Sequence, residues 1–503
     1  MKKGFFILLI LALLAFGQFS TAQAAATTLS WVVSVTYQNV GTGPTSVSVD
    51  FYPEGNATPI NFDPLSGGTL AAGAGASFYI GSVGGLSAGF NGNAVMASSQ
   101  PLVATVVEFH QNAAGETVKM RMLSNGFQAS DASNQYLIAT TLLNKFNRTT
   151  LFSIQNTTGS AVSATVKFYD ADNSGALAAT VTHSIPANSS KYIDMAIPAD
   201  TNLPGGTTTF NGSAIITVPS GTIVSSVSEL YNNRNVGANF EGIPLSRVAN
   251  TIYMATGLCE SASLDTYYAV QNASLTNSAS ITVTYRNTNG TTKTTDGPYT
   301  IGPGQKKSIT TCAPSSGVNM HGYTGAASVV SVGAPIAVIG KAQCSVAAGQ
   351  CSADKVDVFT IFLGESAGAS NLALPFVRWA NDANYNAASN LGGKQRTYLA
   401  IQNLEATTSA VDVQYYDKTG TLCGTDHLSI PALAKGNSNA SVPAGVLGCG
   451  TMNAGEFGYY TDGSFGGSVL VKAGAANPTA KIIAIARVQN PGAGEDYNAV
   501  PVP

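Results

Sequence analysis

A Gln-Asn pair closes a short apolar run at four places along the chain, and it is the first of three markers that recur in fixed order. The pairs are Gln38-Asn39, Gln155-Asn156, Gln271-Asn272 and Gln402-Asn403. A tyrosine lies 14 residues beyond each Gln, at Tyr52, Tyr169, Tyr285 and Tyr416. An aromatic-x-Gly triplet follows, ending at Gly92, Gly212, Gly325 and Gly467. Three markers repeated four times predict four copies of one structural unit.

The segments between these markers alternate between apolar and other residues, as Thr45–Tyr52 does. Such a period of two is typical of half-buried strands, and about seven short strands per unit favour antiparallel β-sandwiches. The pattern resembles the immunoglobulin-like and fibronectin-III-like modules found in tandem in bacterial secreted proteins. That resemblance implies an all-β chain of four β-sandwich domains in an elongated row. The expected boundaries are 27–135, 136–250, 251–370 and 371–503.

Residues 1–26 have the features of a secretory signal peptide. Lys2 and Lys3 precede an apolar run from Phe5 to Phe16, and Ala22-Gln23-Ala24 offers a cleavage site of small residues. The apolar run is too short to span a bilayer, and no later stretch is long enough. We therefore expect a secreted protein, extracellular or at the cell surface, with no membrane span.

The composition narrows the class of partner. Charged residues make up 10% of the chain and the net charge is −3, which gives no field to attract nucleic acid. Disorder is also disfavoured, because 44% of the residues are apolar and many of them alternate. The remaining partners are other surface or matrix proteins, a second copy of the chain in a polymer, or polysaccharide.

The six cysteines all lie in the third and fourth units, and their even number in an exported chain favours disulfides. Cys344 and Cys351 flank a short loop, and Cys423 and Cys449 are the only two in the fourth unit. Cys259 and Cys312 then form the third pair. A metal site is disfavoured because no CxxC pair occurs, and we expect no cofactor.

The repeated markers themselves have a structural explanation. Asparagine tolerates left-handed backbone, and its amide bonds nearby backbone groups, so an Asn at the end of a strand is ordinary turn chemistry. The glycine of each aromatic-x-Gly triplet permits a bulge or a close backbone approach. We expect the four asparagines, four tyrosines and four glycines of these markers to stabilise the units and not to bind a ligand.

Two motifs suggest chemistry but lack the context that it needs. Gly364–Gly368 matches the G-x-S-x-G elbow of carboxylesterases, with Ser366 as nucleophile, yet no amphipathic helix follows it and His427 is the only later histidine. Asp170–Gly175 begins like a calcium loop, but position 181 is a valine where that loop requires glutamate. A hairpin turn is the simpler interpretation, and we expect no catalytic residue.

The leading hypothesis is therefore a non-catalytic structural or adhesive protein, in which the C-terminal Tyr497–Pro503 lends a strand to the next molecule. The alternative is a polysaccharide-binding protein that uses outward rings of tyrosine doublets and the insertion at 380–395. An esterase acting through Ser366 is the third hypothesis.

Overall fold

The computed structural model describes residues 30–111, 117–232, 237–345, 359–387, 394–449, 465–490 and 493–503. The described chain is all-β, as expected, with antiparallel sheets and two one-turn helices, α2 (Pro198–Thr201) and α3 (Asp382–Tyr385). Within those ranges no helix has the length and apolar character that crossing a membrane requires. The predicted signal peptide lies outside the described residues.

Each repeat contributes an inner sheet, which holds the strand ending in Gln-Asn, and an outer sheet, which holds the strand ending near the marker tyrosine. We call these four sets of strands units 1 to 4. The inner sheet of unit 1 has the order β4 (Gly75–Tyr79), β1 (Ser30–Asn39), β6 (Leu102–Gln111), β7 (Thr117–Asn125). Its outer sheet has the order β3 (Ile60–Phe62), β2 (Val47–Pro53), β5 (Gly92–Ser98).

Unit 2 repeats this order and adds strands to both sheets. Its inner sheet is β12 (Ser190–Asp194), β9 (Arg148–Asn156), β15 (Ser226–Tyr231), β16 (Gly237–Glu241), with β14 (Ile223–Val224) also on β9. Its outer sheet is β11 (Ala176–Ile185), β10 (Val162–Asp170), β13 (Phe210–Thr217), β8 (Gln135–Leu143), β17 (Ile243–Pro244).

Units 3 and 4 follow the same plan. The inner sheet of unit 3 has the order β22 (Lys306–Thr310), β19 (Leu264–Asn272), β24 (Ile336–Cys344), β25 (Phe359–Leu363). Its outer sheet has the order β21 (Thr292–Ile301), β20 (Ala279–Asn287), β23 (Tyr323–Val332), β18 (Thr251–Cys259). The inner strands of unit 4 have the order β30 (Lys435–Asn439), β27 (Arg396–Asn403), β32 (Ile482–Asn490), β33 (Ala493–Asn498). Its outer strands have the order β29 (Leu422–Ile430), β28 (Ser409–Tyr416), β31 (Phe465–Ala473), β26 (Asn371–Trp379), β34 (Val500–Pro501). The two sheets of unit 4 are joined where Trp379 pairs with Arg396.

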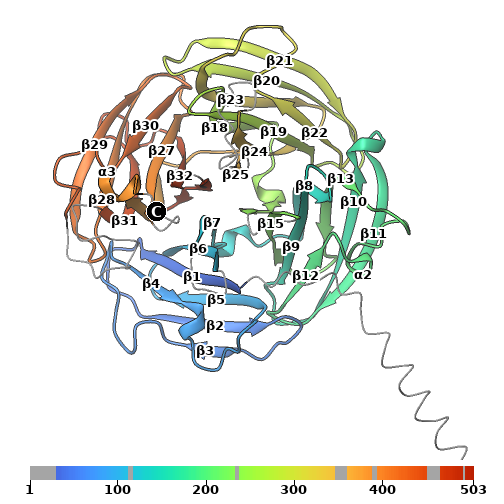
Figure 1. The fold of residues 1–503 in the computed structure, drawn as a ribbon, viewed down its shortest axis with the longest axis horizontal. Coiled ribbons are helices and arrows are strands. Elements are labelled where there is room, and N and C mark those ends of the chain that lie inside the picture. The colour runs from blue at the N-terminus through green and yellow to red at the C-terminus, as the bar shows by residue number, and fades with distance from the viewer. Residues whose placement is uncertain are drawn as a thin grey trace, which may run out of the picture.

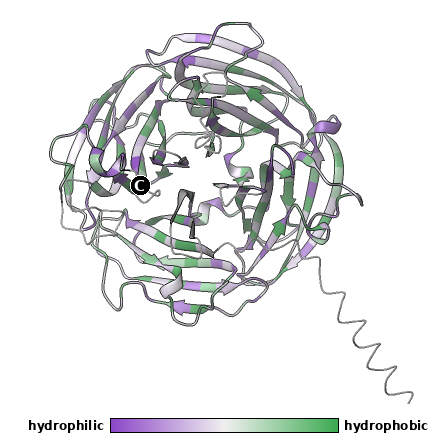
Figure 2. Cartoon of the chain, in the orientation of Figure 1, coloured by the Kyte–Doolittle hydropathy of each residue, from purple (hydrophilic) through white to green (hydrophobic). Residues whose placement is uncertain are grey.

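Alternation along each strand produces these sheets. In β10, for example, Val162, Ala164, Val166 and Phe168 are buried while the residues between them face outward. Figure 2 shows the hydrophobic residues distributed along the strands of all four units. Each unit thereby fills the space between its two sheets with one set of apolar side chains.

The elongated row expected from the sequence is wrong, because the four units form a closed ring (Figure 1). The inner-edge strands β7, β16, β25 and β33 meet around its axis, so that β7 of unit 1 contacts β33 of unit 4. Strand β26 of unit 4 also contacts β1 and β6 of unit 1. The row was expected from the resemblance to tandem modules. In the ring, side chains of neighbouring units bond backbone groups of the inner-edge strands, as Glu495 does with Asn239 N.

Units 2, 3 and 4 each begin with a leading strand, β8, β18 or β26, which pairs with the strand that carries the marker glycine. Unit 1 has no such strand among the described residues. The C-terminal segment, expected to reach the next molecule, pairs within its own chain: β33 with β32, and β34 with β26. The inner sheet of unit 4 lacks its edge strand without this segment, so the segment is already engaged.

Candidate functional site

The four anchor asparagines occupy equivalent buried positions and make the same bonds. In unit 3, Asn272 Nδ2 donates to the carbonyl oxygens of Asn277, Ile301 and Gly302 at 2.7, 3.1 and 3.0 Å, and its Oδ1 accepts from Ser274 N at 2.9 Å. Asn39, Asn156 and Asn403 each also donate to three carbonyls and accept from the amide two residues on. All four are fully buried. Each side chain thus ties the end of an inner strand to the loop that crosses between the sheets.

The marker glycines lie where two backbones approach closely. A Cβ at Gly92, Gly212 or Gly467 would lie 2.1 Å from the carbonyl oxygen of the marker tyrosine, and at Gly325 it would lie 2.0 Å from Arg286 O. The pairing register shifts close to Gly212 and opposite Gly325 and Gly467. The marker tyrosines Tyr52, Tyr169 and Tyr285 are buried and Tyr416 is half-buried, and burial raises the pKa of all four phenols.

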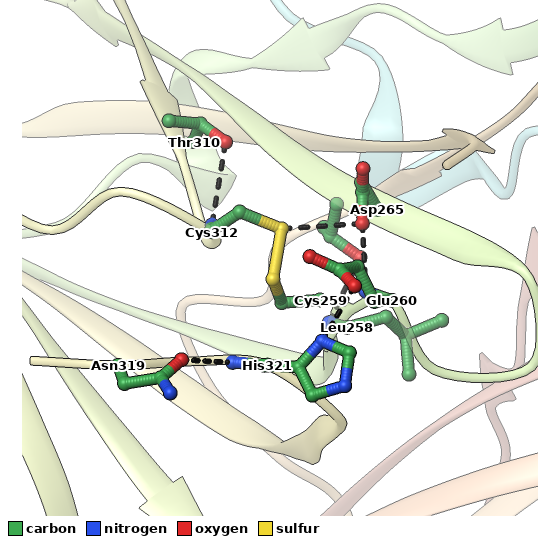
Figure 3. Close-up of a disulfide and its surroundings, with 9 residues drawn as sticks. Leu258, Cys259, Glu260, Asp265, Thr310, Cys312, Asn319 and His321 are labelled. Atoms are coloured by element: carbon green, nitrogen blue, oxygen red, sulfur yellow. Dashed lines mark hydrogen bonds and ion pairs between the residues drawn. A yellow bond between two sulfur atoms is a disulfide. The ribbon is translucent and has the colours of Figure 1, made fainter. Parts of the chain in front are cut away.

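Two of the predicted disulfides, Cys259–Cys312 and Cys423–Cys449, are confirmed. Cys344 is disulfide-bonded as well, while Cys351 lies outside the described residues. Figure 3 shows Cys259–Cys312 beside Asp265, whose Oδ1 lies 3.1 Å from Cys312 Sγ. These two cysteines and Asp265 are close enough together to hold a metal ion, but both sulfur atoms are used in the disulfide. His321 Nδ1 and Glu260 Oε2 form a neighbouring pair 2.5 Å apart, which no motif in the sequence indicates (Figure 3).

Ser366 lies in the segment between β25 and β26, so a strand follows it where the esterase elbow requires a helix. The preceding Glu365 accepts two bonds from Arg247 Nη2, at 2.7 and 2.8 Å, and one from Asn498 Nδ2 at 2.7 Å. The motif therefore contributes its glutamate to a contact between units 2, 3 and 4. Asp172 of the calcium-like turn is bound by Lys145 and Asn211 at 2.7 and 2.8 Å.

In the two tyrosine doublets that the structure describes, the outward rings are only partly exposed. Tyr267 and Tyr416 are only half-exposed, and their partners Tyr268 and Tyr415 are fully buried in the core. The third doublet, Tyr459-Tyr460, lies outside the described residues. Of the insertion in unit 4, the described part contains α3, where Asp382 pairs with Arg396 at 2.5 Å.

Buried charges join unit 2 to unit 3. Arg148 Nη1 donates to Glu229 Oε1 at 2.8 Å and its Nη2 donates to Gln343 at 3.2 Å, while Lys341 pairs with the other oxygen of Glu229. The Arg148 guanidinium also stacks over Phe359 at 4.2 Å. Desolvation opposes ionisation of Glu229, but the two cations lower its pKa to about 2. The carboxylate stays charged because Arg148 of its own unit and Lys341 from across the seam both pair with it.

A second group of polar side chains lies on the ring axis, and we call Asn125, Asn239, Glu241, Glu495 and Asn498 the axial cluster. Glu495 Oε1 accepts from Asn239 N at 3.0 Å and from Leu123 N at 3.5 Å, and Glu241 accepts from Asn125 N. Asn125 Nδ2 donates to Asn498 O at 2.7 Å, and Asn498 exchanges two 2.9 Å bonds with the backbone of Leu363. Side chains from one inner-edge strand thereby satisfy backbone groups of the next.

The axial carboxyls are held away from water. Burial raises the pKa of Glu241 and, more strongly, of Glu495, although backbone N–H donors oppose that rise. Burial also raises the pKa of Glu108, whose Oε2 accepts from Asn239 Nδ2 at 3.1 Å. These carboxyls act as fixed hydrogen-bond acceptors between units 1, 2 and 4. The sequence offered one sign of this, because Asn or Glu occurs in the inner-edge strands of those three units, at Asn125, at Asn239 and Glu241, and at Glu495 and Asn498.

No known family model matches the sequence, and no curated protein matches it either.

Proposed function

We propose that this is a secreted, non-catalytic structural or adhesive protein of the bacterial cell surface or extracellular matrix. We retain the interpretation that each unit is an immunoglobulin-like sandwich. The predicted signal peptide and the disulfides Cys259–Cys312 and Cys423–Cys449 support export to an oxidising compartment.

The observation that carries the proposal is the closure of the ring around the axial cluster. The side chains of Glu495, Glu241 and Asn498 in this cluster bond backbone groups of neighbouring units. The esterase-like motif serves the same purpose through Glu365 and Arg247. Polar chemistry in the interior is therefore used to hold the units together, which suits a rigid body that presents its outer surface to partners.

Localisation tests the proposal directly. The full-length protein, produced with its own leader in the source bacterium, is expected to co-sediment with cell envelopes or matrix and to be labelled there by immunogold electron microscopy. Retention of the intact protein in the cytoplasm, or its recovery only as free monomers in the medium, would contradict the proposal.

A further inference from the structure

Strand β5 of unit 1 has an open edge where each of its three sister strands has a neighbour. Strand β13 pairs with both β10 and β8, β23 with both β20 and β18, and β31 with both β28 and β26. Among the described residues, β5 pairs only with β2. The position taken by a leading strand in units 2, 3 and 4 is therefore open in unit 1.

The exposure of β5 agrees with this difference in pairing. Ala94, Val95, Ala97 and Ser98 are all exposed, and the side chain of Val95 is 42% accessible. In β13 of unit 2, by contrast, Ala214, Ile215 and Ile216 are at most 1% accessible. Exposed residues occur on both faces of β5, because neighbours in a strand point to opposite faces, although Met96 packs against the core of unit 1.

The seam between units 1 and 2 also lacks the apolar continuity of the other three seams. The core of unit 2 includes Ile339 and Phe359 of unit 3, that of unit 3 includes Ile485 of unit 4, and that of unit 4 includes Val107 of unit 1. Among the described residues, the core of unit 1 contains none from unit 2. The leading strands contribute to those contacts, since β8 packs on β19 and β24, β18 on β27 and β32, and β26 on β1 and β6.

Polar contacts connect units 1 and 2 at one end of β5. The Tyr192 hydroxyl donates to Gly92 O at 2.6 Å, Asn93 Nδ2 donates to Asn188 O at 3.0 Å, and Tyr192 N donates to Glu54 Oε1 at 2.9 Å. The rest of the strand has none of the usual protection of an open edge, since residues 92–98 contain no charge and no proline. An exposed, neutral, unprotected edge is a template for pairing with another strand.

We propose that the open edge of β5 binds in trans an extended segment of another protein, antiparallel to β5, in the position that β8, β18 and β26 hold in the other units. This inference rests on the proposed function, for which it supplies the contact surface. The three leading strands define the chemistry of the ligand: a neutral or nearly neutral stretch of about nine residues with apolar side chains facing both the unit core and the neighbouring unit, as in Gln135–Leu143.

The chain itself offers no described donor for this position. Four residues separate each leading strand from the anchor strand in units 2 and 3, at 144–147 and 260–263. Gln38 and Gln155 are 117 positions apart, so the counterpart of residues 135–143 is 18–26, which cleavage after the predicted signal peptide removes. The C-terminal strands β33 and β34 of a second copy are paired within that copy's own chain, so they are not free to fill the position.

A peptide with the sequence of Gln135–Leu143, extended by lysines for solubility and labelled with a fluorophore, is the probe. We expect saturable binding of one peptide per secreted full-length protein by fluorescence anisotropy. Val95→Lys places a charge on the open edge and should weaken binding at least about tenfold. Val330→Lys is the matched control, because Val330 is 41% accessible but lies in the sister strand β23, which is paired on both edges; it should bind as the wild type does.

A self-complemented variant provides the second measurement. The sequence of residues 135–147, a leading strand with its turn, is placed directly before Trp31, which is the counterpart of Arg148. This variant should no longer bind the peptide, and its melting temperature should rise by at least about 2 °C.

The proposal is overturned if the peptide does not bind, if Val95→Lys binds as well as Val330→Lys, or if sequencing of the mature protein shows that residues 18–26 are retained and fill the site in cis. Peptide binding by a protein that fails to attach to cells would contradict only the proposed function, whereas attachment without peptide binding would contradict only the strand site.

Discussion

At the scale of single residues, this chain relies on a few buried amides to set where strands end. Each anchor asparagine donates to three carbonyl groups beside the end of its strand, and some of these, such as Gly302 O, also accept a backbone N–H. A buried carbonyl without a partner costs about 1–3 kcal/mol. The repetition of Asn at four equivalent sites is therefore explained by backbone chemistry.

Asn272→Ala should destabilise the protein by about 2–4 kcal/mol, because it removes three donated bonds and one accepted bond at a fully buried site. Equilibrium urea unfolding followed by circular dichroism measures the change. Asn289→Ala is the control, since Asn289 is exposed in a turn, and we expect it to cost less than about 1 kcal/mol. Equal losses for the two variants would contradict the role given to the anchor.

A second residue, Lys435, makes stability depend on pH. Its ammonium is buried between units 3 and 4, where it donates to Thr324 Oγ1 at 2.9 Å and Thr256 Oγ1 at 3.3 Å. Burial, with help from the charge of Arg487, lowers the pKa of Lys435 to about 7. Between pH 7 and the ordinary pKa of 10.5 the unfolded chain binds more protons than the folded one, so this group makes stability rise with pH in that window.

Lys435→Met should therefore stabilise the protein most at pH 7 and below, on the order of a few kcal/mol, and the advantage should disappear as the pH approaches 10.5. Thermal melting of both proteins between pH 6 and 10 measures the difference, in which the titration of other groups cancels. Lys293→Met is the control because Lys293 is exposed, and its effect should be small at every pH. An advantage of Lys435→Met that is constant with pH would show that the ammonium is not responsible.

At the scale of strands, much of the plan could be read from the sequence. Period-two alternation predicted a strand at Thr45–Tyr52, where the structure has β2 (Val47–Pro53), and Cys423 was correctly paired with Cys449 as the only other cysteine of its unit. The closing of the ring could not be predicted from the sequence. The residues that close it, such as Glu495 and Asn498, are polar residues in short strands, and polar residues in other short strands of the chain face water. Their partners are backbone groups more than a hundred residues away, and no periodicity records such contacts.

Each marker glycine lies in a strand whose backbone closely approaches that of its neighbour, and a substitution by alanine tests that approach. In Gly212→Ala the new Cβ would lie 2.1 Å from Tyr169 O, so β10 and β13 must separate, and we expect a loss of about 2 kcal/mol or more. Gly205→Ala is the matched control in the same unit, since a Cβ there meets no atom within 4 Å. Chemical unfolding compares the two, and a Gly212→Ala protein as stable as Gly205→Ala would refute the close approach.

At the scale of the whole molecule, the four units are arranged in a closed ring and not in an elongated row. The inner sheets of the four units end at strands β7, β16, β25 and β33, and edge strands carry backbone groups that must be paired, covered or solvated. Side chains of the axial cluster pair with several of these groups across the units. Because β33 lies between β7 and β25, the last unit joins the first and completes the ring.

Removal of residues 493–503 should therefore open the ring without unfolding the first three units. Glu495 and Asn498 are lost with β33, so Leu123, Asn239 and Leu363 lose their bonding partners on the axis. Small-angle X-ray scattering should show a larger radius of gyration, and thermal melting should change from one cooperative transition to at least two. A control that removes only residues 502–503 keeps β33 and β34 and should scatter as the intact chain does. An unchanged radius of gyration in the longer deletion would mean that the other seams alone hold the ring closed, and that the axial cluster has a purpose other than closure.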